Sequence, residues 1–201
     1  MTSSAGGTSS RIRFVTLVTE VFSPVYLVTG LLLVVALHSA SSTREAVVLG
    51  MVAAVFASLL PFVVLLRGVR SGRLNDRHLR LREQRPAMMV MALASVLIGS
   101  AVLVAWGAPQ ELLALLAAMV AGLVTTLAVT LVWKISIHAA VAAGTAAILV
   151  SVFGPAMLFA TPLVALIAWS RIVLTHHTVP QVVVGAVVGA VIAAGVFQLL
   201  R

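Results

Sequence analysis

The segment 170–181 carries side chains suited to nucleophilic chemistry, and it lies between two strongly apolar runs. It contains Arg171, the adjacent pair His176 and His177, and Gln181. An Arg and two His beside apolar runs are costly unless they face a polar site, so we interpret the segment as a functional site. Gln181 follows His177 by four residues, which places its amide within reach of the imidazole on a helix. An amide that holds one ring nitrogen leaves the other free as a nucleophile.

Only one of the two histidines is expected to enter this site. Adjacent residues on a helix point about 100° apart, so both rings cannot face the same position. His177 is separated from Arg171 by six residues and from Gln181 by four. We therefore predict that His177 is the reactive histidine and that His176 is its neighbour.

A second polar cluster, Lys134, Ser136 and His138, stands earlier in the chain, at the beginning of the apolar run 138–154. A histidine at a helix start is often only structural. Here Ser136 is placed to cap the helix and leave its first N–H groups directed at an anion. With Lys134 beside it, the cluster favours a site for a negatively charged group.

A third cluster is the loop 67–86, which carries seven arginines against Asp76 and Glu83. Within it, His78, Arg82 and Arg85 are spaced by four and three residues and would share one helical face. Such a face could hold a phosphate through guanidinium groups. The alternative is a solvated basic loop beside anionic lipid.

The elements that must position these clusters are membrane helices. The chain is 62% hydrophobic and 9% charged, with a mean hydropathy of +1.20, whereas about 25% of residues are charged in soluble domains. We predict an all-α, polytopic integral membrane bundle of six or seven transmembrane helices, with 1–20 as a polar basic tail and 21–201 as one transmembrane domain. The apolar stretches are 21–38, 46–66, 87–106, 111–132, 138–154, 156–171 and 181–200.

Two features of the apolar runs leave alternatives open. The fifth and sixth runs are short and separated by Gly154 and Pro155, so they could form a tight helical hairpin or one kinked segment. Gly185 and Gly189 allow close helix approach, either within the chain or between two copies in a homo-oligomer. With no cysteine, the chain has no disulfide, thiolate catalyst or Cys-ligated metal.

The alternation of spans places the three polar clusters and the tail on one face of the membrane. Eleven of the 13 Lys and Arg residues lie on that face, which predicts that it is cytoplasmic. Because the charge lies beside spans, the expected partners are membrane lipids and phosphate groups and not nucleic acid. The localisation we expect is a cell membrane of the bacterial inner-membrane type.

Taken in order, the three clusters resemble the three motifs of the type-2 phosphatidic acid phosphatase superfamily, which includes vanadium haloperoxidases, dolichyl diphosphatases and glucose-6-phosphatase. The third motif is Ser-Arg, five residues, His, three residues and Asp. It is matched by Ser170, Arg171 and His177, with Gln181 at the Asp position, as in dolichyl diphosphatases and glucose-6-phosphatase.

The other two motifs are matched in part. In the second, Pro-Ser-Gly-His, Ser136 and His138 align, while Ile135 and Ile137 replace Pro and Gly. The first is Lys, six residues, then Arg-Pro. Arg85 and Pro86 match it, His78 stands at the Lys position, and Arg82 or Arg77 could supply the missing cation.

The resemblance implies a phosphatase that needs no metal or other cofactor and works through a phosphohistidine. It implies His177 as nucleophile, His138 as general acid and Gln181 as orienting group. Further residues are implied as phosphate ligands: Arg82, Arg85, Arg171, Ser136, Lys134 and His78. The expected substrate is a lipid phosphate, first a polyprenyl phosphate or diphosphate, then phosphatidic acid or phosphatidylglycerol phosphate.

Two other classes of protein remain as alternatives. One is a non-catalytic lipid-binding or transport protein with degenerate motifs, favoured by His78, Ile135 and Ile137. The other is a prenyltransferase that uses Asn75 and Asp76 to hold magnesium. This alternative is disfavoured because the sequence has no second acidic cluster to complete a metal site.

Overall fold

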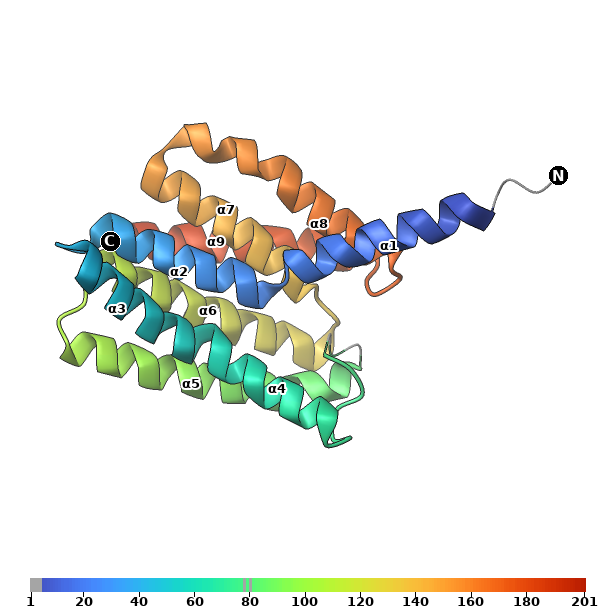
Figure 1. Cartoon of the computed structure of the whole chain (residues 1–201), viewed down its shortest axis with the longest axis horizontal. Coiled ribbons are helices and arrows are strands. Elements are labelled where there is room, and N and C mark those ends of the chain that lie inside the picture. Colours follow the sequence, from blue (N-terminus) through green and yellow to red (C-terminus); the bar gives the residue numbers. More distant parts are fainter. Residues whose placement is uncertain (1–4, 78, 80) are drawn as a thin grey trace.

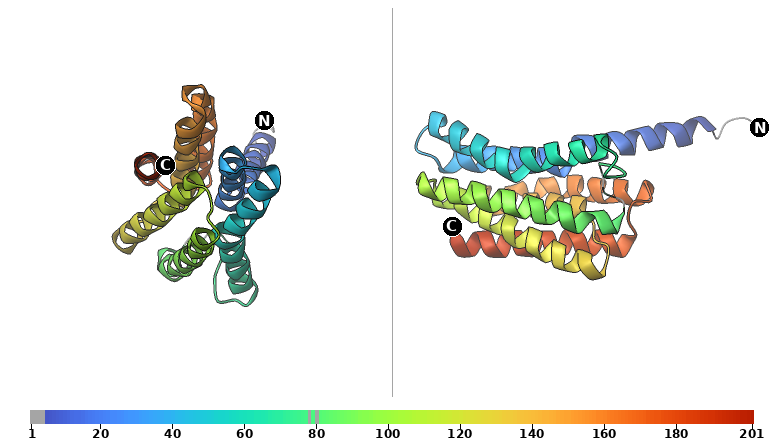
Figure 2. Two further views of the ribbon diagram at one scale, coloured as in Figure 1. Left: turned by 90° about the vertical axis from the view of Figure 1, so that its left-hand side faces the viewer. Right: turned by 90° about the horizontal axis from the view of Figure 1, so that it is seen from below.

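In the computed structural model, which describes residues 5–77, 79 and 81–201, every regular element is a helix. The helices lie side by side in an elongated bundle (Figures 1 and 2). They are α1 (Ala5–Val21), α2 (Pro24–Ser39), α3 (Thr43–Ala54), the π-helix η1 (Val55–Leu59), α4 (Leu60–Arg70), the 3-10 helix η2 (Arg82–Gln84), α5 (Arg85–Ala105), α6 (Gln110–Val132), α7 (Ile137–Phe153), the 3-10 helix η3 (Pro155–Ala160), α8 (Thr161–Val173) and α9 (Val179–Leu200).

The helix boundaries follow from local chemistry. Ser42 caps α3 by accepting the Glu45 N–H at 3.2 Å, which supplies a partner that the first turn lacks. Gly107 after α5 and Gly154 after α7 have φ of +70° and +86°, a left-handed conformation that glycine adopts readily. These stops set the lengths of the apolar helices.

Several of these helices are long and apolar enough to cross a membrane, which confirms the predicted class of the fold. Among the described residues there are five, and a sixth if α1 and α2, bent by 41°, form one broken span. The helix α7 is apolar but only 17 residues long. The five are Thr43–Arg70, Arg82–Ala105, Gln110–Val132, Pro155–Val173 and Val179–Leu200.

The segment 1–20, predicted to be a polar tail, instead contains most of α1. Val15 and Thr19 of this helix are almost completely buried. The Thr19 hydroxyl lies 2.9 Å from the Ser170 hydroxyl, and the Arg11 guanidinium lies over the Trp169 ring. Because α1 packs on α8 in this way, it belongs to the folded domain.

The fifth and sixth apolar runs form a helical hairpin and not one kinked segment. The chain reverses after Gly154, and α8 runs back along α7 toward the end from which α7 came (Figure 1). The positive φ of Gly154 permits the reversal, and Pro155 begins the 3-10 turn that follows.

The small-residue stripe of α9 is occupied within the chain, by α7. A Cβ on Gly185 would lie 2.6 Å from the Ser136 carbonyl oxygen, and a Cβ on Gly189 would overlap the backbone of Ala140. Gly144 of α7 faces Gly189 in turn. The two helices therefore pack backbone against backbone, as small residues allow.

The bundle has two different ends. The chain segments 71–77, 133–136 and 174–178 meet at one end, together with the end of α1, while segments 40–42 and 106–109 and the turn at Gly154 lie at the other (Figure 1). The three polar clusters of the sequence are thus brought to a single end, which we call the polar end.

Candidate active site

A cavity of about 210 Å³ lies at the polar end, and four of the predicted site residues line it. They are Arg85 at the start of α5, His138 in the first turn of α7, Arg171 in the last turn of α8, and His177 before α9. Each comes from a different helix or loop, so the cavity collects residues from all three clusters of the sequence.

The expected contact between His177 and Gln181 is present. The Nδ1 atom of His177 lies 3.1 Å from the Oε1 atom of Gln181. The Thr178 N–H donates to the same Oε1 at 3.2 Å, as part of the capping box that begins α9. Because a carbonyl oxygen can only accept, Nδ1 must carry the proton in this contact. The neutral ring then has its lone pair on Nε2.

The surroundings of His177 keep its ring neutral. Burial lowers the pKa of His177 from 6.5 to about 3, with contributions from the positive charges of Arg85, Arg171 and Lys134, while the Gln181 hydrogen bond acts in the opposite direction. The residue is 7% exposed. At neutral pH the Nε2 atom is therefore an unprotonated nitrogen among cations, which suits it to meet an anionic group.

The turn between α8 and α9 fixes the position of His177. The carbonyl oxygen of Arg171 accepts the N–H groups of both His176 and His177, at 3.1 and 3.3 Å. Thr175, which directly precedes the two histidines, has a φ of +54°, which is uncommon for a residue with a branched Cβ. The turn holds His177 against the end of α8, so Arg171 and His177 are positioned by one backbone unit.

Arg85 links two of the clusters through backbone contacts. It is 3% exposed, its Nε donates to the Leu79 carbonyl at 2.8 Å, and one terminal nitrogen donates to the Ile135 carbonyl at 2.9 Å. Leu79 has a φ of +47°. The guanidinium therefore ties the loop before α5 to the segment before α7 while lining the cavity.

Ser136 and Lys134 differ in how they relate to the cavity. Ser136 is fully buried, its hydroxyl accepts the Ala139 N–H at 3.4 Å, and its own N–H donates to the Gln181 carbonyl at 3.1 Å. This is the predicted helix cap, and it joins α7 to α9. Lys134 is half-buried, and its charge lowers the pKa of His177.

Five described residues that were singled out in the sequence are not part of the cavity wall: Arg82, Lys134, Ser136, His176 and Gln181. Arg82 is half-buried in η2 and is absent from the lining, where Arg77 stands in its place. His176 is buried but is not part of the cavity wall. His78 lies outside the described residues.

The comparisons add nothing to this geometry. No family model, curated protein or solved structure matches the chain. Its function must therefore be inferred from the site itself.

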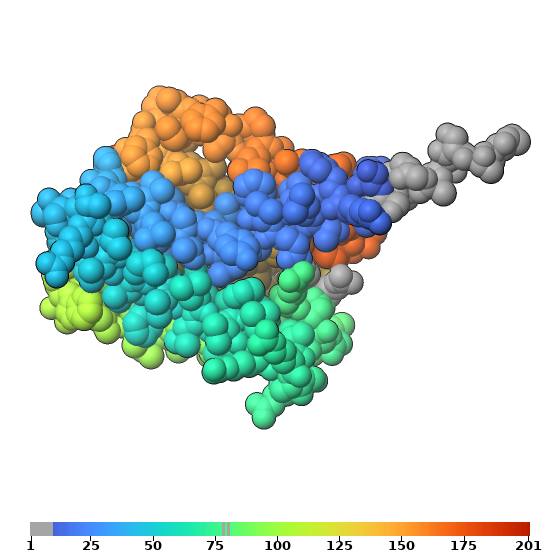
Figure 3. Space-filling model, viewed as in Figure 1, coloured from blue at the N-terminus to red at the C-terminus, as the bar shows by residue number. Residues whose placement is uncertain are grey.

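Two residues that line the cavity were not predicted as site residues. Glu20 was not singled out, and Arg77 was only an alternative to Arg82. Glu20, at the end of α1, lines the cavity and pairs with Arg77, with 2.6 Å between Oε1 and the guanidinium nitrogen. On the face drawn in Figure 3, the chain after α4 reaches α1. The sequence did offer one clue, because Glu20 is one of only five acidic residues and the only one in the basic segment 1–20.

The arrangement is suited to transfer of an anionic group. A neutral imidazole nitrogen, held in one tautomer, faces a cavity whose wall carries three guanidinium groups and a second imidazole. Guanidinium groups match phosphate oxygens in geometry, and fixed charges in a site stabilise developing negative charge. The second imidazole, on His138, is of the type that commonly transfers a proton to a leaving group.

Proposed function

We propose that this protein is a membrane-embedded phosphatase that removes phosphate from a lipid phosphate or diphosphate through a phosphohistidine on His177. The observation that carries the proposal is the contact of His177 Nδ1 with Gln181, in a cavity lined by Arg85, Arg171 and His138. It supports a nucleophile, an anion site and a proton donor in one place. The motif resemblance to the type-2 phosphatidic acid phosphatases points to the same chemistry.

In the first step, His177 Nε2 attacks phosphorus and forms an N–P bond. The bond between phosphorus and the lipid oxygen breaks, and its electron pair leaves with that oxygen. His138, as imidazolium, donates a proton to the departing oxygen, so the lipid alcohol, or the lipid monophosphate from a diphosphate, leaves with that oxygen protonated. Arg85 and Arg171 balance the charge on the remaining phosphoryl oxygens.

In the second step, water attacks the phosphohistidine. His138, now neutral, takes a proton from the water as the new O–P bond forms. The N–P bond breaks, its electrons return to Nε2, and inorganic phosphate is released. His138 is again protonated and His177 is again neutral, so the cycle closes with water as the other reactant.

The substrate we propose is a polyprenyl phosphate or diphosphate, with phosphatidic acid or phosphatidylglycerol phosphate as the next candidates. We further propose seven passes, counting α1 with α2 as one and including α7. The described ends of the chain, which lie at opposite ends of the bundle (Figure 1), are consistent with an odd number. The polar end carries the basic loops, so we place it on the cytoplasmic side of a bacterial inner membrane.

The function is tested with protein purified in detergent and a panel of lipid phosphates. Phosphate release should persist in the presence of a chelator, which a magnesium-dependent prenyl-transfer enzyme would not survive. Brief reaction with radiolabelled substrate should leave an acid-labile, base-stable label on the wild type and on His38→Ala, but none on His177→Ala. Binding of lipid phosphates without phosphate release or label would instead identify a non-catalytic lipid-binding protein.

The orientation is tested separately with single cysteines, because the chain has none of its own. Ser71 at the end of α4 and Ser41 before α3 are exposed at opposite ends of the bundle. In intact cells an impermeant thiol reagent should label Ser41→Cys and not Ser71→Cys. The reverse pattern would place the polar end outside.

A further inference from the structure

A second cavity, of about 310 Å³, lies in the interior of the bundle beside the cavity that His177 lines. We call the second one the inner cavity and the one at the polar end the polar cavity. Its walls come from α2, η1, α4, α5, α6, α7 and α9. It shares six lining residues with the polar cavity: Pro24, Val25, Phe62, Leu65, Leu79 and Ile137. The two spaces therefore adjoin each other along these six apolar residues, and His177 lines only the polar cavity.

The inner cavity is built for an apolar occupant. Two of the hydroxyl groups in its wall have partners, since Ser58 contacts Thr29 at 2.6 Å and Thr126 donates to the Gly122 carbonyl at 2.7 Å. Met88 and Met119 line it, and methionine side chains adapt to the shape of an apolar ligand. With a share of about 30 Å³ per water, its volume corresponds to about ten water-sized groups, the size of one short stretch of hydrocarbon chain.

Irregular backbone opens this space. The π-helix η1 interrupts the long helix formed by α3 and α4, and Pro61 follows in the first turn of α4. Ala57, Ser58 and Pro61 all face the cavity. Wide π-turns occur frequently at functional sites. The Ser95 hydroxyl donates to the Phe56 carbonyl at 2.6 Å within this turn, so the irregularity is held by a specific contact.

Gly122 also leaves the cavity open. It lies in the middle of α6, it is half-buried, and a Cβ added there would meet no atom within 4 Å, although Gly122 is part of the cavity wall. It stands ten residues before the end of α6, which at 1.5 Å per residue is about 15 Å from the polar end. A side chain at this position would occupy the deep part of the space.

We infer that the inner cavity holds the hydrocarbon chain of a single-chain lipid phosphate whose phosphate occupies the polar cavity. The inference rests on the proposed function and deepens it, because it places the chain inside the bundle and selects prenyl phosphates over two-chain phospholipids. The cationic wall fits the head group, and the volume of the adjoining apolar space fits one chain.

The first test compares substrates of different chain length on Gly122→Leu. We expect kcat/KM for farnesyl phosphate to fall about 10- to 100-fold, the range for altered fit in an apolar pocket. Hydrolysis of dimethylallyl phosphate, whose single prenyl unit ends before this depth, should stay within about twofold of wild type. Gly30→Leu is the matched control, since Gly30 is helical, exposed and equally free of neighbours within 4 Å. It should change neither rate.

The second test measures occupancy without catalysis. Gly122→Cys should react with a small maleimide, and farnesyl phosphate should slow that reaction at least about tenfold, whereas inorganic phosphate should not. Gly30→Cys should not be protected. Equal protection of Gly122→Cys by phosphatidic acid would overturn the selection of single chains.

These outcomes separate the two proposals. A wild type that hydrolyses farnesyl phosphate, with Gly122→Leu equally active and Gly122→Cys unprotected, would overturn the tail cavity and leave the phosphatase intact. A wild type that hydrolyses no lipid phosphate while farnesyl phosphate still protects Gly122→Cys would overturn the phosphatase and leave a lipid-binding site.

Discussion

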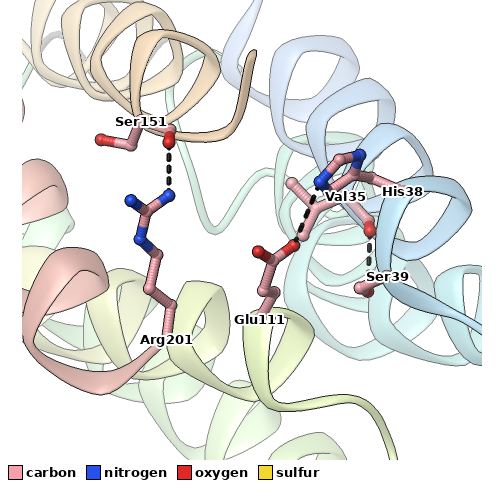
Figure 4. Close-up of polar contacts among 6 residues, drawn as sticks. All are labelled: Val35, His38, Ser39, Glu111, Ser151 and Arg201. Atoms are coloured by element: carbon pink, nitrogen blue, oxygen red, sulfur yellow. Dashed lines mark hydrogen bonds and ion pairs between the residues drawn. The ribbon is translucent and has the colours of Figure 1, made fainter. Parts of the chain in front are cut away.

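The two ends of the bundle each hold a histidine beside an oxygen acceptor, in different surroundings. At the polar end, His177 contacts the neutral amide of Gln181 at 3.1 Å and is 7% exposed. At the other end, His38 in the last turn of α2 lies 3.8 Å from the Glu111 carboxylate, with 41% of its side chain exposed (Figure 4). Its ring meets Phe153 edge to face.

The difference shows how surroundings and not residue type decide what a histidine can do. The contact between His38 and the Glu111 carboxylate joins α2 to α6. The amide of Gln181 instead orients the His177 ring, and the cations around that ring oppose its protonation. Near His38, Arg201 likewise serves the fold, because it donates to the Ser151 carbonyl and joins the chain end to α7 (Figure 4).

The largest expected effect is on catalysis, and it should appear at one end only. His177→Ala should lower kcat by at least about 10³-fold, because it removes the proposed nucleophile. His38→Ala should change kcat less than about twofold, and His176→Ala should also retain substantial activity. Initial rates of phosphate release measure all three. A loss in His38→Ala as large as that in His177→Ala would mean that the two ends do not differ in the way described.

The next effect concerns the partner of the reactive ring. Gln181→Leu should lower kcat/KM by about 10²-fold, because the ring is no longer held in one tautomer and orientation. Gln181→Glu keeps an acceptor of the same reach and adds a charge, so it should retain the fold and move the pKa of His177 upward.

The pH profile of kcat/KM distinguishes these variants, since it reports groups of the free enzyme. The neutral ring is the reactive form, so activity falls as the pH drops through the pKa of His177. That limb should lie at higher pH in Gln181→Glu than in wild type. Full activity of Gln181→Leu with an unchanged profile would remove Gln181 from the mechanism.

The sequence was sufficient for the class of the fold and for one contact of the candidate site. Hydropathy predicted the apolar helices, and the spacing of Arg171, His177 and Gln181 predicted a contact that the structure contains. Both rest on local periodicity, which one sequence displays. The alternation of spans also brought the three clusters to one end, as the structure does.

The parts that the sequence could not predict depend on contacts between distant segments. Nothing local indicates that Glu20 meets Arg77, which lies 57 residues away, or that the Gln181 carbonyl accepts the Ser136 N–H. The segment 1–20 was predicted to be a tail because polar residues dominate its start, whereas Val15 is buried and Thr19 contacts Ser170 of α8. The inner cavity is equally invisible, since it results from a π-turn and from glycine on a facing helix.

A smaller effect is expected on stability as the pH falls. The pKa of His177 is about 3 in the folded protein and 6.5 in the reference state, so the unfolded chain binds more protons between these values. The contribution of His177 to the free energy of unfolding is therefore greatest above pH 6.5. It decreases as the pH falls toward 3, by about 2 kcal/mol at pH 5. Thermal unfolding in detergent should show a weaker pH dependence in His177→Ala than in His38→Ala. Parallel curves for the two variants would contradict the burial of a neutral ring.

The smallest expected effect concerns one acidic residue at each end of the bundle. Glu20 lies at the polar end and Glu111 at the other, and the test is whether they differ in their effect on phosphate binding. The side chains of Glu20 and Arg77 are 30% and 52% exposed, so their ion pair should contribute less than about 1 kcal/mol to stability. Glu20 nevertheless lines the cavity proposed for phosphate. Its carboxylate repels an anion there, and it holds a guanidinium that a phosphate could use.

Glu20→Gln should therefore strengthen inhibition by inorganic phosphate, lowering its inhibition constant about two- to fivefold at low salt, and the gain should shrink as ionic strength rises. Glu111→Gln, at the other end of the bundle, is the matched control and should leave the constant unchanged. An inhibition constant that does not respond to Glu20→Gln at low salt would mean that phosphate binds beyond the reach of this carboxylate. The anion would then sit deeper, between Arg85 and Arg171, and Arg77 would serve only to hold the loop before α5 against α1.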